Sequence, residues 1–127
     1  MVELIEKELS YQLTGVCYKV HNRLGRFLTE KQYCDALVVE LEKEGIAFTR
    51  EELIVANPEN YSLKIGRPDF IVEKRIVLDA KAKKFITKAD YEQMLKYLYL
   101  TNIRLGLIVN FHSSYLKAKR VVNNKIH

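Results

Sequence analysis

The 127-residue chain is 48% hydrophobic with only five glycines and two prolines, which excludes a disordered or collagen-like polypeptide. We expect residues 1–127 to form a single domain, because a chain of this length can bury about two thirds of its unfolded surface. The first ten residues, MVELIEKELS, are acidic where a secretory signal is basic and apolar, and no apolar run has membrane-spanning length. The sequence therefore predicts a cytoplasmic protein with no membrane partner.

The net charge of +5 is unevenly distributed along the chain. Residues 1–70 carry nine Lys/Arg and twelve Asp/Glu, a net charge of −3, whereas residues 71–127 carry twelve and four, a net charge of +8. A basic half fits a polyanionic partner such as nucleic acid, although a solvated lysine-rich surface explains the charge equally well. Cys17 and Cys34 have neither disulfide nor metal-site spacing, and we interpret both as reduced core residues.

Two helices are predicted in the first third of the chain. Apolar side chains recur at helical spacing over residues 5–24, and Gly25 follows as a stop signal. Thr29 stands three residues before Gln32, which is the pattern of a capping box. The second helix therefore begins next to Thr29 and ends at Gly45.

Strands and one further helix are predicted in the remainder of the chain. Four runs have strand character, at residues 47–55, 61–65, 69–72 and 76–80. Thr87 can cap a third helix that extends to Leu100, and residues 105–111 are typical of another buried strand. The segment 115–122 fits a strand or a helix. This alternation of helices and strands predicts an α/β protein.

Two aspartates and a lysine lie in the stretch RPDFIVEKRIVLDAKAKK, among apolar runs where an unpaired charge is costly to bury. If residues 73–75 form a turn between antiparallel strands, Asp69 and Asp79 are equidistant from it and lie opposite each other. Asp79 and Lys81 share a strand face, because strand residues alternate sides. Two facing carboxylates favour a cation between them, and Mg²⁺ suits an all-oxygen site. The lysine can then orient an attacking water or stabilise charge on a phosphoryl group.

Asp69, followed by Asp79 and Lys81 on the next strand, resembles the active-site motif of the PD-(D/E)xK nuclease superfamily. More narrowly, the chain resembles the small bacterial GxxExxY proteins assigned to that superfamily. The matching segments cover most of the chain and are residues 20–25, 30–37, 66–69 and 79–81, Gln93 with Tyr97, and residues 105–111. One loop departs from the family, because Phe27 replaces its glycine and Arg26 stands where proline is common.

The resemblance implies a restriction-endonuclease-like core, in which a central mixed β-sheet is flanked by α-helices. It implies a nuclease that hydrolyses phosphodiester bonds with Mg²⁺ or Mn²⁺. The ion would be bound by Glu30, Asp69, Asp79 and the Ala80 carbonyl, while Lys81 assists the attack by water. We expect a nucleic-acid partner, with DNA favoured over RNA, and a homodimer is one way for so small a nuclease to grip two strands.

Glu30 is one of the implied metal ligands, but the sequence without the resemblance does not decide whether it reaches the metal. It stands one turn before Tyr33, and this spacing continues to Leu37, so it is predicted on the inward face of the second helix. The resemblance implies that Glu30 reaches the metal site. The alternative is a first-turn glutamate that only the helix dipole stabilises.

Several residues are given supporting roles. Gln93 and Tyr97 resemble a Gln-x-x-x-Tyr element that lies beside the catalytic centre in the nuclease domains of recombination helicases, although one turn of partly exposed helix is the alternative. His21 matches a histidine of the family, and a lone histidine is usually structural or on the surface. Three lysines are candidates for phosphate contacts, namely Lys83, Lys84 and Lys88.

Two other classes of function are consistent with the same pattern. The fold could serve as a nucleic-acid-binding or assembly module with an idle site, and the Phe27 departure keeps that alternative open. A purely structural oligomerisation domain is a third interpretation, but it leaves the converging acidic residues unexplained.

Overall fold

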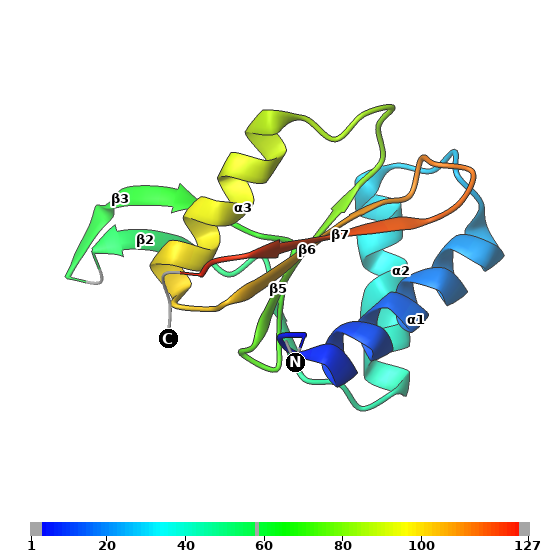
Figure 1. Ribbon diagram of the computed structural model, residues 1–127, viewed down its shortest axis with the longest axis horizontal. Helices are drawn as coiled ribbons and strands as arrows, with labels where there is room; N and C mark the ends of the chain where they lie inside the picture. Colours follow the sequence, from blue (N-terminus) through cyan, green and yellow to red (C-terminus); the bar gives the residue numbers. More distant parts are fainter. Residues whose placement is uncertain (1–3, 58, 125–127) are drawn as a thin grey trace.

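The computed structural model describes residues 4–57 and 59–124 of the chain. Three helices and seven strands follow one another in the described residues (Figure 1): α1 (Lys7–Leu24), α2 (Glu30–Lys43), β1 (Phe48–Arg50), β2 (Ile54–Asn57), β3 (Asn60–Gly66), β4 (Phe70–Val72), β5 (Ile76–Lys81), α3 (Lys88–Thr101), β6 (Leu105–Asn110) and β7 (Lys117–Val122). None of these helices is long and apolar enough to cross a membrane.

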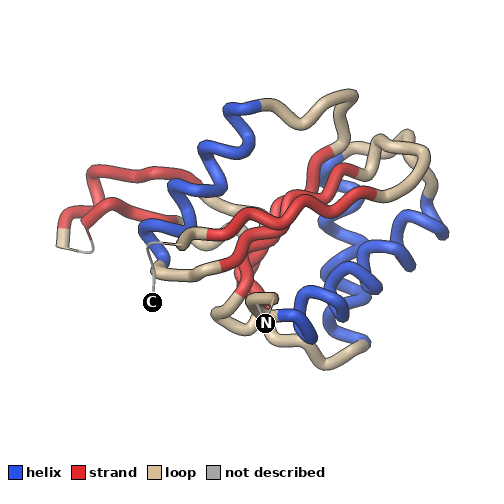
Figure 2. The backbone as a smooth tube through the Cα atoms, in the orientation of Figure 1, coloured by secondary structure: helices blue, strands red, loops and turns tan. Residues whose placement is uncertain are grey.

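Five of the strands form one mixed sheet, in the order β1-β4-β5-β6-β7. The β5 and β6 strands run parallel because α3 connects them, and the other neighbouring pairs are antiparallel. The β2–β3 hairpin is a separate two-stranded sheet. Helices α1 and α2 cover one face of the large sheet and α3 covers the other (Figures 1 and 2). This arrangement confirms the predicted α/β architecture.

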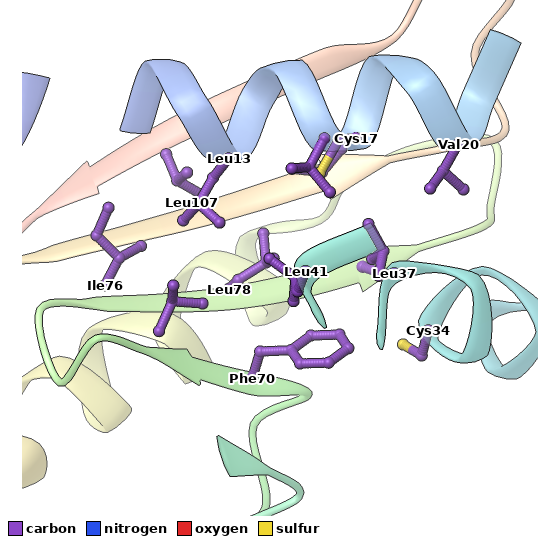
Figure 3. Packing of buried hydrophobic residues seen from close by; sticks show 14 of the residues in the cluster. Leu13, Cys17, Val20, Cys34, Leu37, Leu41, Phe70, Ile76, Leu78 and Leu107 are labelled. Atoms are coloured by element: carbon purple, nitrogen blue, oxygen red, sulfur yellow. The ribbon is translucent and has the colours of Figure 1, made fainter. Parts of the chain in front are cut away.

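The two faces of the sheet are buried in two hydrophobic cores. The larger core packs α1 and α2 against the sheet through residues such as Leu13, Leu37 and Leu78 (Figure 3). The smaller core packs α3 through Met94 against the opposite face, which includes Val77. Consecutive residues of β5 therefore alternate between the cores, so that Asp79 and Lys81 project on the side of α3. Both cysteines are free and buried in the larger core, as predicted.

The predicted strand over residues 47–55 is wrong, because the chain breaks there into β1 and β2, which belong to different sheets. Glu51 interrupts the run with a left-handed backbone (φ 56°). Its amide donates to the Asp69 carbonyl at 3.1 Å, and its own carbonyl accepts from the Arg67 guanidinium at 2.9 Å. The ambiguous segment at the end of the chain is a strand, since β7 pairs with β6 along its whole length. The other predicted elements are confirmed to within two residues at each end.

The packing of α3 on the sheet leads to the first prediction, which concerns Gly106 in β6. An added Cβ at Gly106 would overlap the sulfur of the fully buried Met94. We expect Gly106→Ala to lower the free energy of unfolding by about 1–3 kcal/mol, because the buried Met94 side chain or its helix must shift to admit the methyl group. Chemical denaturation measures this change.

A matched control is Gly15→Ala on the exposed side of α1, where an added Cβ meets no atom within 4 Å. That substitution should raise stability by about 0.5–1 kcal/mol, because alanine favours the helix. Equal effects of the two substitutions would contradict the packing of α3 on Gly106.

Candidate active site

The β4–β5 hairpin brings Asp69 and Asp79 together, as the spacing predicted. Phe70 pairs with Leu78, and the amide of Arg75 donates to the Val72 carbonyl at 2.9 Å to close the turn. The amide of Asp69 donates to Oδ1 of Asp79 at 3.0 Å. In return, the Ala80 amide donates to Oδ2 of Asp69 at 2.8 Å. Each carboxylate is therefore held by the backbone of the opposite strand.

This pairing carries an electrostatic cost. Asp79 is only 5% exposed and Asp69 is half-buried. Burial, followed by the charge of Asp79, raises the pKa of Asp69 to about 6, against the lowering effects of the Ala80 amide and Lys81. Burial likewise raises the pKa of Asp79, which the Asp69 amide and Lys81 partly offset. Both carboxylates are thus harder to ionise than in water and would gain from a nearby cation.

Lys81 lies at the end of β5 beside these carboxylates, with a side chain that is only 16% exposed. Its Nζ atom is 3.9 Å from Oδ1 of Asp90, while Nζ of Lys83 is 2.5 Å from the other oxygen of the same carboxylate. Asp90 also completes the capping box of α3 with Thr87. One acidic side chain therefore holds both lysines.

Sequence reasoning missed Asp90, although a usable signal was present. Asp90 stands three residues after Thr87, the spacing of a capping box, which marks it as a residue at the start of α3. Its distance from Lys81 depends on how α3 docks on the sheet after the crossover, and the local pattern does not contain that information.

Tyr97 is the supporting residue that the structure places beside the acidic pair. The tyrosine is buried, and a Cβ added at Gly66 would lie 2.7 Å from its hydroxyl oxygen. Burial raises the pKa of Tyr97, and the charges of Asp79 and Asp69 raise it further. Its hydroxyl thus packs on the backbone that leads to Asp69. Gln93, one turn earlier on α3, is exposed.

Glu30 is the first residue of α2 and is exposed, although its spacing puts it on the same helix face as buried Tyr33 and Leu37. It belongs to the turn that Thr29 and Gln32 cap, and this turn projects beyond the core. Its charge still contributes to the raised pKa values of Asp69 and Asp79. Within the described part of the chain, no three His, Cys, Asp or Glu side chains gather closely enough to hold a metal ion. Glu30 therefore acts on the pair through its charge and does not close a three-carboxylate cluster among the described residues.

His21 and the predicted phosphate-binding lysines occupy different surroundings. His21 is buried near the end of α1, where Nε2 lies 3.0 Å from the Ser113 carbonyl oxygen, so these contacts fix the loop after β6. Lys84 is exposed in the loop after β5. Lys88 is exposed at the start of α3 and lies 3.7 Å from Glu92. Lys83 is the one of the three lysines that contacts the site, through Asp90.

Comparisons with known proteins place this geometry in a wider group. The structure is similar to the crystal structure of an alkaline exonuclease from Laribacter hongkongensis, with a TM-score of 0.54 and 14% sequence identity over 98% of this chain and 73% of that chain. This likeness confirms the predicted restriction-endonuclease-like fold. No curated protein matches the sequence. The family model of the PD-(D/E)XK nuclease superfamily matches residues 7–122, a span that includes the acidic pair, Lys81 and Tyr97. The chain therefore belongs to the PD-(D/E)XK nuclease superfamily.

Proposed function

We propose that residues 1–127 act as a single metal-dependent nuclease domain that hydrolyses phosphodiester bonds of nucleic acid, with DNA favoured over RNA. The observation that carries the proposal is the reciprocal pair of amide bonds that holds Asp69 and Asp79 together, with Lys81 on the same strand face as Asp79. Membership of a nuclease superfamily supports it independently. Two buried free cysteines fit the expected cytoplasmic location.

The donor set of the acidic pair fits a hard divalent ion. Members of this superfamily generally use divalent metal ions. Asp69 and Asp79 offer carboxylate oxygens, and the raised pKa values of both side chains mean that a cation there relieves repulsion. Mg²⁺ or Mn²⁺ needs few protein ligands, because such ions keep several waters. In the proposal, Glu30 and the Ala80 carbonyl are further ligands, and Glu30 would have to swing inward.

The bound ion would polarise a phosphodiester oxygen and lower the pKa of a bound water. The residues of the chain have separate tasks around it. Lys81 orients the attacking water or stabilises charge on the phosphoryl group. Asp90 positions Lys81 through the 3.9 Å contact between the carboxylate and Nζ. Tyr97 excludes water from the side of the acidic pair that faces α3.

The proposal has two further parts, which are the narrower family of the chain and the way in which it cleaves nucleic acid. In this proposal the chain is one of the GxxExxY proteins, which its quoted segments resemble apart from Phe27. The solved neighbour is an alkaline exonuclease, so cleavage from strand ends is the first mode to test. A homodimer would supply a second site where both strands of a duplex are cut.

A catalytically idle binding or assembly module on the same fold is the second candidate. The observation in its favour is that Glu30 does not complete a three-carboxylate cluster among the described residues. Such a module would bind nucleic acid through lysines such as Lys84 but would not cleave it with any metal ion. Incubation of the protein with mixed DNA and RNA in Mg²⁺, Mn²⁺ or EDTA separates the two functions directly.

The raised pKa of Asp69 predicts how stability depends on pH in the absence of metal. The pKa rises from 3.8 to about 6 on folding, so the folded state holds a proton that the unfolded chain has released. This stabilising contribution is complete below about pH 4 and is lost as the pH rises through about 6. In EDTA, Asp69→Asn should therefore raise the free energy of unfolding by on the order of 1 kcal/mol at about pH 8 and change it little at about pH 4.

Asp35→Asn is the matched control, because its hydrogen bond with Arg50, followed by that with Lys31, lowers the pKa of exposed Asp35. Its contribution is present above its unfolded pKa and is lost as the pH falls, so this substitution should lower or leave unchanged the stability at about pH 8. Denaturation curves at the two pH values measure both. Loss of stability in Asp69→Asn at about pH 8 would point to a structural role instead.

Lys81 provides the test that separates an enzyme from a binding module. We expect Lys81→Ala to lower cleavage at least about 100-fold while affinity changes little, because its main interaction forms in the transition state. Lys84→Ala should weaken binding, reduce its salt dependence by about one unit of slope and leave the rate of the bound complex unchanged. Lys74→Ala, in the turn at the opposite end of β5, is the neutral control.

Cleavage rates and salt-dependent affinities of the three variants are measured side by side. Equal losses in Lys81→Ala and Lys84→Ala, or a wild type that cleaves nothing, would contradict the enzymatic proposal and favour the binding module.

A further inference from the structure

Three loops meet at one end of the sheet, next to the acidic pair. We define the edge loops as residues 25–29 between α1 and α2, residues 82–87 after β5, and residues 111–116 after β6. The second and third follow the carboxyl ends of two parallel strands, so they lie at the same edge (Figure 2).

Hydrogen bonds tie the edge loops to one another. The Asn110 side chain accepts from the Lys83 amide at 3.3 Å and donates to the Lys83 carbonyl at 2.7 Å, which joins the loop after β5 to the end of β6. The Arg26 guanidinium donates to the His112 carbonyl at 2.7 Å and to the Ser114 hydroxyl at 3.2 Å. These bonds link the three loops to one another through the end of β6.

Each edge loop presents one exposed aromatic side chain. Phe27 is 82% exposed, Phe85 is 76% exposed and Tyr115 is 84% exposed. Two other rings, those of Tyr33 and Phe111, are buried instead and stack in the core with their centroids 4.4 Å apart. An exposed phenylalanine gains nothing from contact with water, so the fold alone does not explain Phe27 and Phe85.

Phe27 already lies among groups that favour planar partners. The Arg26 guanidinium lies 5.2 Å from the centre of its ring, and the ring of His112 approaches at 6.5 Å with an interplanar angle of 83°. These contacts leave most of the Phe27 side chain in solvent. The ring is thus held by neighbours and offers a further surface for stacking.

The charge of the edge loops selects the kind of partner. Their sequences, GRFLT, AKKFIT and FHSSYL, contain Arg26, Lys83 and Lys84 and no aspartate or glutamate, and of these cations Lys83 pairs with Asp90 of α3. A second copy of this chain would bring equally positive loops and would be repelled. A polyanion with flat apolar groups suits a surface that combines cations with exposed rings, and nucleic acid is such a polyanion.

We propose that the edge loops bind an unpaired segment of nucleic acid, with bases stacked on Phe27 and Phe85 and phosphates beside Arg26 and Lys84. The bases of a duplex have their faces covered by neighbouring pairs, so only unpaired bases can use these rings. The inference rests on the proposed nuclease function where it names the substrate. That substrate is a single strand or a duplex with a single-stranded end.

Phe27 and Phe85 are both close in the sequence to residues of the candidate active site. Phe27 precedes Glu30 by three residues, and Phe85 follows Lys81 by four. A strand stacked on the two loops therefore passes the edge at which Asp79 and Lys81 end β5. The loop that departs from the GxxExxY pattern thus gains a role, because Phe27 supplies a ring where glycine supplies none.

The test measures binding of the whole chain in EDTA, so that cleavage plays no part. The probe is a DNA oligonucleotide that contains 2-aminopurine, whose fluorescence is quenched by stacking, offered as a single strand and as the matching blunt duplex. We expect the single strand to bind at least tenfold more tightly than the duplex. Phe27→Ala and Phe85→Ala should each weaken this binding about tenfold and reduce the quenching, as expected for the loss of one stacked base.

Two control variants make the test specific. Tyr11→Ala removes a ring that is also 82% exposed but lies on α1, and it should leave binding unchanged. Phe27→Tyr keeps an aromatic ring and should retain the affinity. Equal binding of duplex and single strand, or equal effects of Phe27→Ala and Tyr11→Ala, would overturn the proposal.

Sedimentation identifies a competing occupant of the surface. Dimerisation of the wild type that Phe27→Ala abolishes would overturn the proposal in favour of contact between two copies of the chain. Failure of the nuclease proposal is recognised separately. If the wild type cleaves nothing with any metal ion, catalysis is refuted. If Phe27→Ala then still binds the single strand more weakly than the wild type does, the binding surface is supported.

Discussion

The reciprocal hydrogen bonding of Asp69 and Asp79 is the constraint on which the rest of the site depends. Two carboxylates are held together by amides of the opposite strand, at distances of 3.0 and 2.8 Å, although burial raises the pKa values of both and the charge of Asp79 raises that of Asp69 further. Such a pair persists only where the surroundings fix the backbone. The tight turn of the β4–β5 hairpin does so on one side, and the backbone of Glu51, bonded to the Asp69 carbonyl, does so on the other.

Helix α3 positions the other residues that surround the acidic pair. Its first turn presents Asp90 to Lys81, and its second half presses Tyr97 against the backbone at Gly66. The helix can supply both contacts because Met94, between them, packs onto the glycine of β6. The acidic pair thus belongs to the hairpin, whereas the position of the lysine depends on the crossover helix. Coupling between the two parts is expected, since Met94 and Tyr97 of α3 share one small core with Val77 of β5.

The elements that sequence reasoning predicted correctly are those that local rules control. The opposition of Asp69 and Asp79 follows from counting residues on either side of a turn, and the common side of Asp79 and Lys81 follows from strand alternation. The break at Glu51 was missed because it depends on bonds to Asp69 and Arg67, which are distant in sequence. The exposure of Glu30 was missed because helical periodicity does not say where the core ends along a helix axis. Both errors concern tertiary context, and the family resemblance did not correct either of them.

The central claim is that Asp69 and Asp79 together form a divalent-metal site. The most direct measurement is anomalous X-ray diffraction near the manganese absorption edge, from crystals of the wild type and of Asp79→Asn soaked in Mn²⁺. The account predicts a strong anomalous peak within bonding distance of both carboxylates in the wild type, and its disappearance in the variant. No peak at these carboxylates in the wild type, or one that survives unchanged in Asp79→Asn, would contradict the account.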